Sequence, residues 1–179
     1  IISTIIINFD ERIKIRLVDQ TINQMFGSKT DKIVLFSKTY EGHYKIALNM
    51  FLEEPLIGHG TKIFRHYCAK PENFVSGNAC TTHPHNILMQ FLAETGLIGT
   101  IFYILVIYFL IKYLLNNFYF LYFKRKQILN DKLLCLTTFY MINFFPFLPS
   151  GNFFNNWISI IYFFPAGLYL LEIKKYKND

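Results

Sequence analysis

The feature that most limits the fold of this chain is a run without charge. Between Leu133 and Leu171 the sequence contains no Asp, Glu, Lys or Arg. A second apolar stretch, from Leu97 to Phe123, has Lys112 as its only charged residue. About 20 apolar residues suffice to cross the hydrocarbon core of a bilayer as a helix. Hydrophobic residues make up 53% of the sequence and charged residues 17%, which is typical of a membrane protein and argues against an ordinary soluble domain.

These two stretches predict three membrane spans. The first covers residues 97–123, and a polar, basic loop follows it at 124–132. The uncharged run is too long for one span, and Pro and Gly residues interrupt it in the middle. It therefore predicts spans at 132–148 and 155–173, joined by an extracytoplasmic turn at 149–154. Because both of these spans are short, a re-entrant hairpin is the alternative.

The distribution of charge predicts the orientation. Residues 1–97 contain 10 Lys and Arg against 9 Asp and Glu, whereas residues 98–179 contain 8 against 3. Most of the excess lies in the loop at 124–132 and in the tail at 174–179, and basic segments beside spans mark the cytoplasmic side. We therefore expect residues 8–96 outside the cytoplasm. Basic clusters that flank apolar spans indicate a lipid bilayer, and not nucleic acid, as the partner.

The first residue is Ile, and residues 1–7 are apolar, which predicts the end of a truncated membrane helix. The chain is therefore expected to be the C-terminal part of an all-α polytopic membrane protein. Its extracytoplasmic part contains a clear amphipathic helix at 42–54, which Pro55 should end. We expect one stripe of that helix to contain Ala47, Met50, Phe51 and Glu54.

A second helix is expected to begin near Pro84, with Thr81 and Thr82 as candidate caps, and to stop at Gly96. Residues four apart in this helix predict a polar face of Asn86, Gln90 and Glu94.

Cysteine usage fits an oxidising compartment. Cys68 and Cys80 flank one polar extracytoplasmic loop, and we expect a disulfide between them that stabilises the fold by roughly 3 kcal/mol. Two free thiols are the alternative for this pair. Cys135 lies in a predicted span and is expected to be unpaired.

Five histidines lie between His43 and His85. A structural zinc site needs four ligands, and the only close pairs here are His83-x-His85 and His66-x-Cys68, so no metal is expected. No Gly-x-Ser-x-Gly pattern supports a serine hydrolase. A histidine near a membrane surface can instead act as a general base on a sugar hydroxyl, while an arginine holds a diphosphate.

The sequence His85-Asn86, nine residues, then Gly96-Leu97-Ile98-Gly99-Thr100 resembles the signature of the O-antigen ligase and polymerase superfamily. The upstream segments at 47–51 and 55–60, followed by Phe64-Arg65, look like the region before the catalytic histidine of that family. The resemblance covers roughly residues 38–172.

This resemblance implies a GT-C-like helical fold, with the chain as a fragment of it, in a multi-pass protein of the bacterial inner membrane. It also implies a metal-independent, inverting glycosyltransferase without a cofactor, with its active site on the periplasmic side. Such enzymes move a glycan from undecaprenyl diphosphate to an acceptor hydroxyl. The acceptor is a lipid A-core sugar for a ligase, the end sugar of another lipid-linked glycan for a polymerase, or a protein.

By the match, His85 is the candidate general base. Family members often carry an arginine shortly before the amphipathic helix, where this chain has Tyr40, Glu41 and His43. Arg65 is therefore the candidate ligand of the donor diphosphate, with Arg12 or Arg16 behind it. The other candidate substrate-binding residues are His83, Asn86 and Gln90.

Two rival interpretations are a non-enzymatic membrane transporter and an inactive, structural fragment. Charged groups inside spans mark transport pathways, but the predicted spans lack Asp, Glu and Arg. The polar cluster lies outside them, which favours chemistry at the membrane surface.

Overall fold

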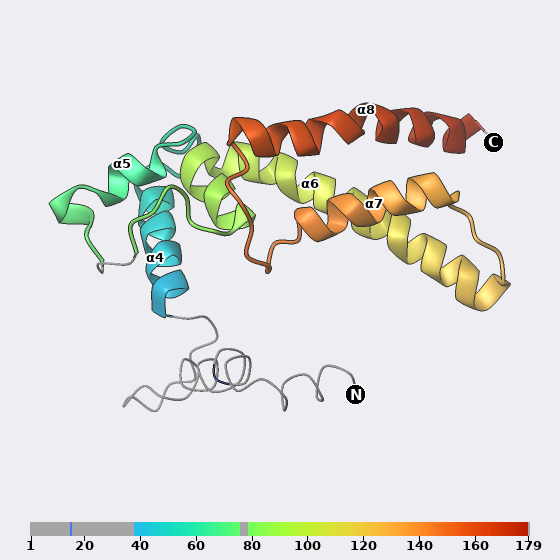
Figure 1. The fold of residues 1–179 in the computed structure, drawn as a ribbon, viewed down its shortest axis with the longest axis horizontal. Helices are drawn as coiled ribbons and strands as arrows, with labels where there is room; N and C mark the ends of the chain where they lie inside the picture. Colours follow the sequence, from blue (N-terminus) through green and yellow to red (C-terminus); the bar gives the residue numbers. More distant parts are fainter. Residues whose placement is uncertain (1–14, 16–37, 76–78, 179) are drawn as a thin grey trace.

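The computed structural model describes residues 15, 38–75 and 79–178, and this part of the chain is helical, without strands. Figure 1 shows α4 and α5 at one end of the molecule and α6, α7 and α8 extending to the other. α4 packs on α6, α6 on α7, and α7 on α8. The elements are α4 (Lys38–Glu53), α5 (Phe64–Cys68), the 3-10 helix η2 (Pro71–Asn73), α6 (Ile87–Lys124), α7 (Asp131–Asn143) and α8 (Asn156–Asn178).

Helix α4 is the predicted amphipathic helix, and it ends two residues before Pro55. Its buried stripe contains Ile46, Ala47 and Met50, and it continues to His43. These positions follow the i, i+3, i+4, i+7 spacing of one helix face. The predicted stripe was therefore displaced toward the C-terminus, because it left His43 out and included Glu54, which is exposed.

Helix α6 begins later than the sequence predicted. Asn86 is its N-cap, and the Asn86 side chain accepts a hydrogen bond from the Met89 amide at 3.0 Å. Pro84 and His85 therefore lie in the preceding loop and not in the first turn, and the predicted caps Thr81 and Thr82 are wrong. An Asn at this position satisfies an amide that the helix itself leaves unpaired.

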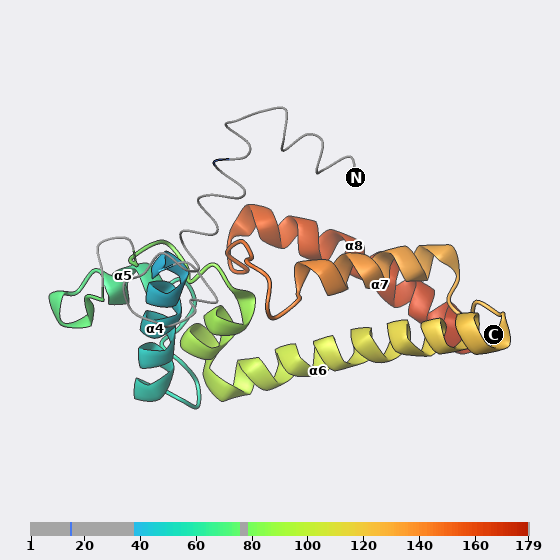
Figure 2. The same ribbon diagram turned by 90° about the horizontal axis from the view of Figure 1, so that it is seen from below.

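A kink at Gly96 divides α6 into a short helix and a long one. The residue has φ +60° and ψ −161°, a conformation that is open to glycine and closed to other residues. Residues 87–95 precede the kink, and residues 97–124 continue as the long apolar helix (Figure 2). The predicted end of the first helix at Gly96 is thus the position of the kink.

The turn after α4 packs directly on this kink. A Cβ atom added to Gly58 would lie 2.6 Å from the Gly96 amide nitrogen, and one added to Gly96 would lie 2.5 Å from the Leu56 carbonyl carbon. Gly58 also has a positive φ, of 67°. Two backbones can approach this closely only where neither carries a side chain.

The same turn supplies the hydrogen bonds that the kink removes from α6. The amides of His59 and Gly60 donate to the carbonyls of Ala93 and Glu94, at 3.2 and 3.0 Å. Beyond the kink, the amides of Leu97 and Ile98 donate to the carbonyls of Pro55 and Leu56, at 2.8 and 3.2 Å. The turn at 55–60 therefore completes both halves of α6 at once, which holds the two segments in a fixed arrangement.

Among the described helices, α6 and α8 are long and apolar enough to cross a membrane. Helix α7 covers 13 residues, or about 20 Å at 1.5 Å per residue, which is short of the hydrocarbon thickness. The predicted span at 132–148 is thus helical only as far as Asn143. The segment at 144–155 that follows is not helical, and it is longer than the predicted turn at 149–154.

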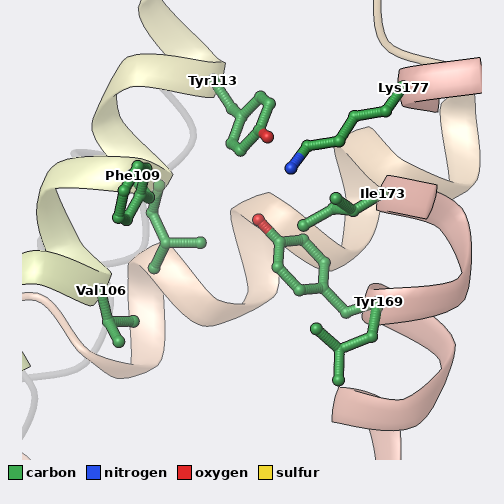
Figure 3. A pocket seen from close by; sticks show the side chains of 8 residues that line it. Val106, Phe109, Tyr113, Tyr169, Ile173 and Lys177 are labelled. Carbon is green, nitrogen blue, oxygen red and sulfur yellow. The ribbon is translucent and has the colours of Figure 1, made fainter.

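An apolar cavity of about 350 Å³ lies between α6 and α8. Figure 3 shows Phe109 and Tyr113 on one helix facing Tyr169 and Ile173 on the other, with the Lys177 amine pointing toward the space between the two tyrosines. The cavity lies beyond the kink, on the part of α6 that belongs to the predicted span.

The crossing of Gly58 and Gly96 makes a specific prediction. Gly96→Ala should lower the free energy of unfolding by about 2–5 kcal/mol, because the added methyl group meets the backbone of Leu56 and the residue has a positive φ. Gly167→Ala is the matched control, since a Cβ atom there meets nothing within 4 Å. Thermal unfolding of the detergent-purified proteins, followed by circular dichroism, measures both. Wild-type melting of the Gly96→Ala protein would contradict the described packing.

Candidate functional site

Three histidines from two segments converge beside the N-terminus of α6. The ring centroids of His83 and His85 lie 4.1 Å apart, and those of His43 and His85 lie 5.2 Å apart. Tyr40 is the fourth ring, with its centroid 6.1 Å from that of His85. Tyr40 and His43 come from the first two turns of α4, and the other two come from the loop before α6. The site is therefore assembled by the packing of α4 on that loop.

Both ring nitrogens of His83 are already used. Its Nε2 atom lies 3.3 Å from the Ser150 carbonyl, which can only accept, so Nε2 carries the proton. Its Nδ1 atom then accepts from the Thr82 hydroxyl at 2.9 Å. Burial lowers the pKa of His83 to about 4, and the neighbouring His85 adds to this effect. The hydrogen bond to the Ser150 carbonyl acts in the opposite direction. His83 is therefore neutral at pH 7 and holds the loop in place.

His85 differs from His83 in each of these respects. No other described residue forms a hydrogen bond with its ring, whose contacts are with the neighbouring rings of Tyr40, His43 and His83. The side chain is partly exposed, and burial and the neighbouring His43 lower its pKa. A neutral imidazole with free nitrogens at a partly open surface is suited to accept a proton from a bound molecule.

The backbone holds His85 in an unusual conformation. Its φ of +54° lies in the left-handed region, which is uncommon for a residue with a side chain. The Ser150 amide donates to the His85 carbonyl at 3.0 Å, and Asn86 begins α6 immediately afterwards. Such strain persists only where the surrounding structure imposes it, and it is concentrated at functional sites. The His85 ring is thus positioned by fixed elements on both sides.

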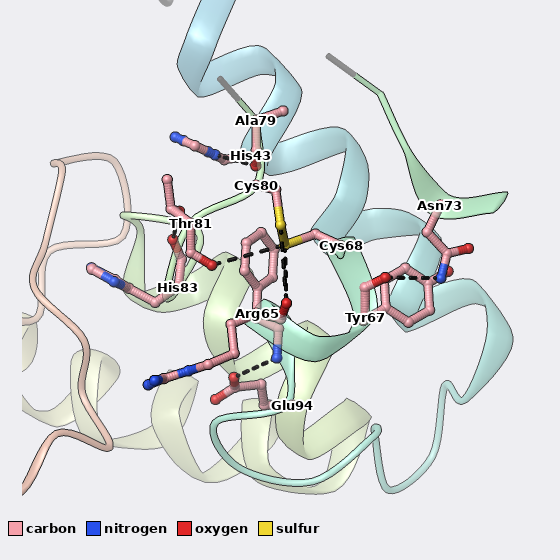
Figure 4. Close-up of a disulfide and its surroundings, with 11 residues drawn as sticks. His43, Arg65, Tyr67, Cys68, Asn73, Ala79, Cys80, Thr81, His83 and Glu94 are labelled. Carbon is pink, nitrogen blue, oxygen red and sulfur yellow. Dashed lines mark hydrogen bonds between the residues drawn. A yellow bond between two sulfur atoms is a disulfide. The ribbon is translucent and has the colours of Figure 1, made fainter. Parts of the chain in front are cut away.

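His43 was not among the candidate site residues derived from the sequence. It is buried on the inner stripe of α4, and its Nδ1 atom donates to the Ala79 carbonyl at 2.7 Å (Figure 4). A buried histidine on an amphipathic helix resembles an ordinary core residue in the sequence. Its place at the end of the buried stripe, at helical spacing from Ile46, Ala47 and Met50, was the available signal.

The predicted polar face of α6 turns inward and is buried. Gln90 is fully buried, and its amide donates to the Glu94 carboxylate at 3.0 Å and to the Asn152 side chain at 2.7 Å. The Gln90 carbonyl oxygen accepts from the Phe153 amide at 3.0 Å. These bonds attach the segment at 144–155 to the site helix.

Asn86 reinforces the same attachment, since its amide donates to the carbonyls of Pro146 and Leu148, at 2.8 and 3.4 Å. The structure therefore brings three of the predicted substrate-binding residues to the site, but it engages their polar groups within the protein. Sequence reasoning missed Ser150 and Asn152, which bind His83, His85 and Gln90 from the segment at 144–155. Their location in the polar interruption of an uncharged run was the signal for them.

Glu94 is a buried carboxyl group on α6, one turn after Gln90. Burial raises its pKa, while hydrogen bonds from Gln90 and from the Phe64 amide, at 3.0 and 3.4 Å, favour the charged form. The Phe64 amide belongs to the first residue of α5, so Glu94 ties α5 to α6.

Arg65 is exposed and projects from α5. In Figure 4 its side chain extends past Glu94 on the side of His83. Its charge lowers the pKa of both of those residues. Within the described part of the chain, no carboxylate forms an ion pair with its guanidinium group. Arg65 is therefore a cation at the edge of the site that is available to an anion. Arg12 and Arg16 lie outside the described residues.

A disulfide joins Cys68 at the end of α5 to Cys80 in the loop that leads to the histidines (Figure 4). Their Cα atoms lie 5.2 Å apart, within the usual range. On the loop-entropy account this bond contributes about 3 kcal/mol. It fixes the loop to α5 three residues before His83. Cys135 is a free, exposed thiol.

Metal-ligating side chains do not form a site in the described part of the chain, where no three of His, Cys, Asp and Glu are arranged to hold an ion. The groups that are present can do two things. His85 can accept a proton, and Arg65 can bind and neutralise an anion near it.

Comparisons with known proteins identify the same region. The family model described as O-antigen ligase matches residues 19–104, a range that contains α4, α5, the crossing of Gly58 and Gly96, and all three clustered histidines. Neither the curated proteins nor the solved structures provide a match. The predicted resemblance is thereby confirmed, and together with the two apolar helices it indicates a membrane protein. Residues 19–104 of this chain are thus similar to the O-antigen ligase family.

Proposed function

We propose that this protein is a glycosyltransferase of the O-antigen ligase type, which moves a glycan from undecaprenyl diphosphate to a sugar hydroxyl. The observation that carries the proposal is the exposure and hydrogen bonding of the His85 side chain. It is the one histidine of the cluster that is partly exposed and has neither ring nitrogen in a hydrogen bond with a described residue. The family match over the same residues supplies the reaction class.

In this reaction, the acceptor hydroxyl oxygen attacks the anomeric carbon of the donor sugar. His85 takes the hydroxyl proton as the new C–O bond forms. The bond from the anomeric carbon to the diphosphate oxygen breaks, and its electron pair leaves with undecaprenyl diphosphate. Arg65 stabilises the negative charge that develops on the leaving group. Attack opposite the leaving group inverts the anomeric centre, and no step calls for a metal or a cofactor.

The acceptor is a lipid A-core sugar in this proposal. The polymerase and protein-glycosylation alternatives use the same base and leaving group and differ only in the molecule that carries the hydroxyl. A transporter is disfavoured by the apolar helices, since residues 97–123 and 133–171 contain no Asp, Glu or Arg on which a transport pathway could be built.

Exposed apolar side chains beside the kink support a location at the membrane surface. Leu52, Leu56 and Ile57 are exposed to 73%, 64% and 67%, and the backbone of Leu56 bonds to that of Ile98, in the apolar helix. These side chains extend the lipid-facing surface past Gly96. We infer that the site lies at the periplasmic surface of the bacterial inner membrane, in a multi-pass, GT-C-like arrangement of helices.

The proposed topology places residues 124–132 and the C-terminal tail in the cytoplasm. Gln127→Cys, in a protein with Cys135→Ser, should not react with a membrane-impermeant maleimide in intact cells, because the basic loop is inside. Thr61→Cys, an exposed position on the site side, is the control that should react. Labelling of position 127 in intact cells would show that the loop lies outside the cytoplasm and would contradict the proposed orientation.

The base assignment predicts unequal effects of the two neighbouring histidines. His85→Ala should lower transfer by about 10²–10⁴-fold, because it removes the proton acceptor. His83→Ala should be milder, since it removes only hydrogen bonds to Thr82 and Ser150. The measurement is glycan attachment in cells that lack their own enzyme, with membrane levels of each protein determined in parallel.

The matched control for these variants is His66→Ala, because His66 is exposed on α5 and outside the cluster. It should transfer glycan at the wild-type level. Normal attachment by the His85→Ala protein at normal abundance would exclude His85 as the base.

Arg65 is expected to require its planar guanidinium group. Arg65→Ala should abolish most transfer, and Arg65→Lys should restore only part of it, because an ammonium group cannot form the paired N–H contacts to a diphosphate. Lys70→Ala removes a nearby exposed cation and should have no effect. The measurement is the transfer rate of each of the three purified variants relative to the wild-type protein. Full activity of both Arg65 variants would show that another group binds the diphosphate.

A further inference from the structure

His43 has a defined proton arrangement although it is buried. The Ala79 carbonyl can only accept, so the 2.7 Å contact with His43 Nδ1 places the proton of the neutral ring on Nδ1. The lone pair is then on Nε2. None of the described residues forms a hydrogen bond with this second nitrogen, and the nearest ring of the cluster is His85, at a centroid distance of 5.2 Å.

Among the described residues, none holds the His85 ring in the way that usually orients a catalytic base. General bases are commonly held by a third group that accepts the N–H on the far side of the imidazole. Carboxylates serve this purpose in many enzymes, but Glu94, the buried carboxylate near the cluster, is bound to Gln90 and to the Phe64 amide. His43 and Tyr40 are the polar rings that α4 presents to His85.

We propose that His43 is the positioning residue for His85, and that its Nε2 lone pair accepts the N–H of the His85 ring during transfer. The inference rests on the proposed function, in which His85 takes the proton of the acceptor hydroxyl. As that proton arrives, the opposite N–H of the His85 imidazolium donates to His43. No bond of His43 is broken in this step. The Ala79 carbonyl, which is fixed one residue before the disulfide at Cys80, holds His43 in the required tautomer.

The proposal explains why a titratable side chain occupies the buried stripe of α4. A leucine at this position would fill the volume but would leave the Ala79 carbonyl without its donor and His85 without an acceptor. It also gives α4 a part in the reaction, because the distance from His43 to His85 is set by the packing of α4 on the loop before α6. Hydrogen bonds of this kind are often long before substrate binds and shorten in the reacting complex.

Two substitutions separate positioning from a purely structural role. His43→Asn places an amide N–H where Nδ1 was, so it preserves the bond to Ala79 but removes the acceptor. His43→Gln places an amide oxygen near the position of Nε2, so it restores an acceptor and weakens the bond to Ala79. If His43 positions His85, the Asn protein loses about 100-fold in kcat with KM unchanged, and the Gln protein is the more active of the two.

The assay uses the full-length protein in nanodiscs, with a lipid-linked glycan donor extracted from the host and purified lipid A-core as acceptor. Greater activity of the Asn protein than of the Gln protein would overturn the proposal, because it would show that only the bond to Ala79 matters. Wild-type kcat in the Asn protein would overturn it as well. His85→Ala and the wild-type protein are measured alongside. If His85→Ala is inactive, such results reject the role of His43 alone, whereas an active His85→Ala protein rejects His85 as the base. A wild-type protein that transfers no glycan in this assay rejects the proposed function itself.

Discussion

The contact between Gly58 and Gly96 is the constraint on which the rest of this structure depends. Both residues have positive φ values, and their backbones lie so close that a Cβ atom on either would overlap the other segment. The four hydrogen bonds around them replace those that the kink removes from α6. This one crossing therefore joins the turn after α4 to the point where the site helix becomes the apolar helix. It contributes to the relative positions of His43 and His85, because His43 lies on α4 and His85 immediately precedes α6.

A second set of contacts connects the apolar helices to the site. The segment at 144–155 leaves α7 and contacts the loop at 79–86 before α8 begins. Asn86, Gln90 and His83 bind it through their side chains, and the backbone of His85 accepts a hydrogen bond from Ser150. Buried polar groups need partners, and the segment at 144–155 supplies one or more of them to each of these three side chains. This segment thus completes the site.

The sequence was sufficient to predict the elements whose signals are local. Helix α4 and its end before Pro55, the break at Gly96, the all-helical character of the described residues and the family of residues 19–104 were predicted from patterns within short segments. The beginning of α6 was not, because Pro84 is favourable in a first turn and the left-handed conformation of His85 depends on Ser150, which is 65 positions away.

Roles that depend on distant contacts were also beyond local reasoning. His43 resembles a core residue until the structure brings it beside His85, and Gln90 resembles a ligand for substrate until its amide is seen bound to Glu94 and Asn152. His85 was expected on a helix, and it lies instead in the loop before α6, with a positive φ.

The pH dependence of glycan transfer tests this account most directly. The base must be neutral to act, so transfer fails as pH falls through the pKa of His85, which burial and His43 lower from its usual value near 6.5. The account predicts that kcat/KM is at its plateau at pH 7 and falls toward acid pH with a midpoint below 6.5. The remaining activity of His85→Ala should show no such midpoint. A midpoint at or above 6.5, or the same acid limb in the His85→Ala protein, would contradict the claim that His85 is the base.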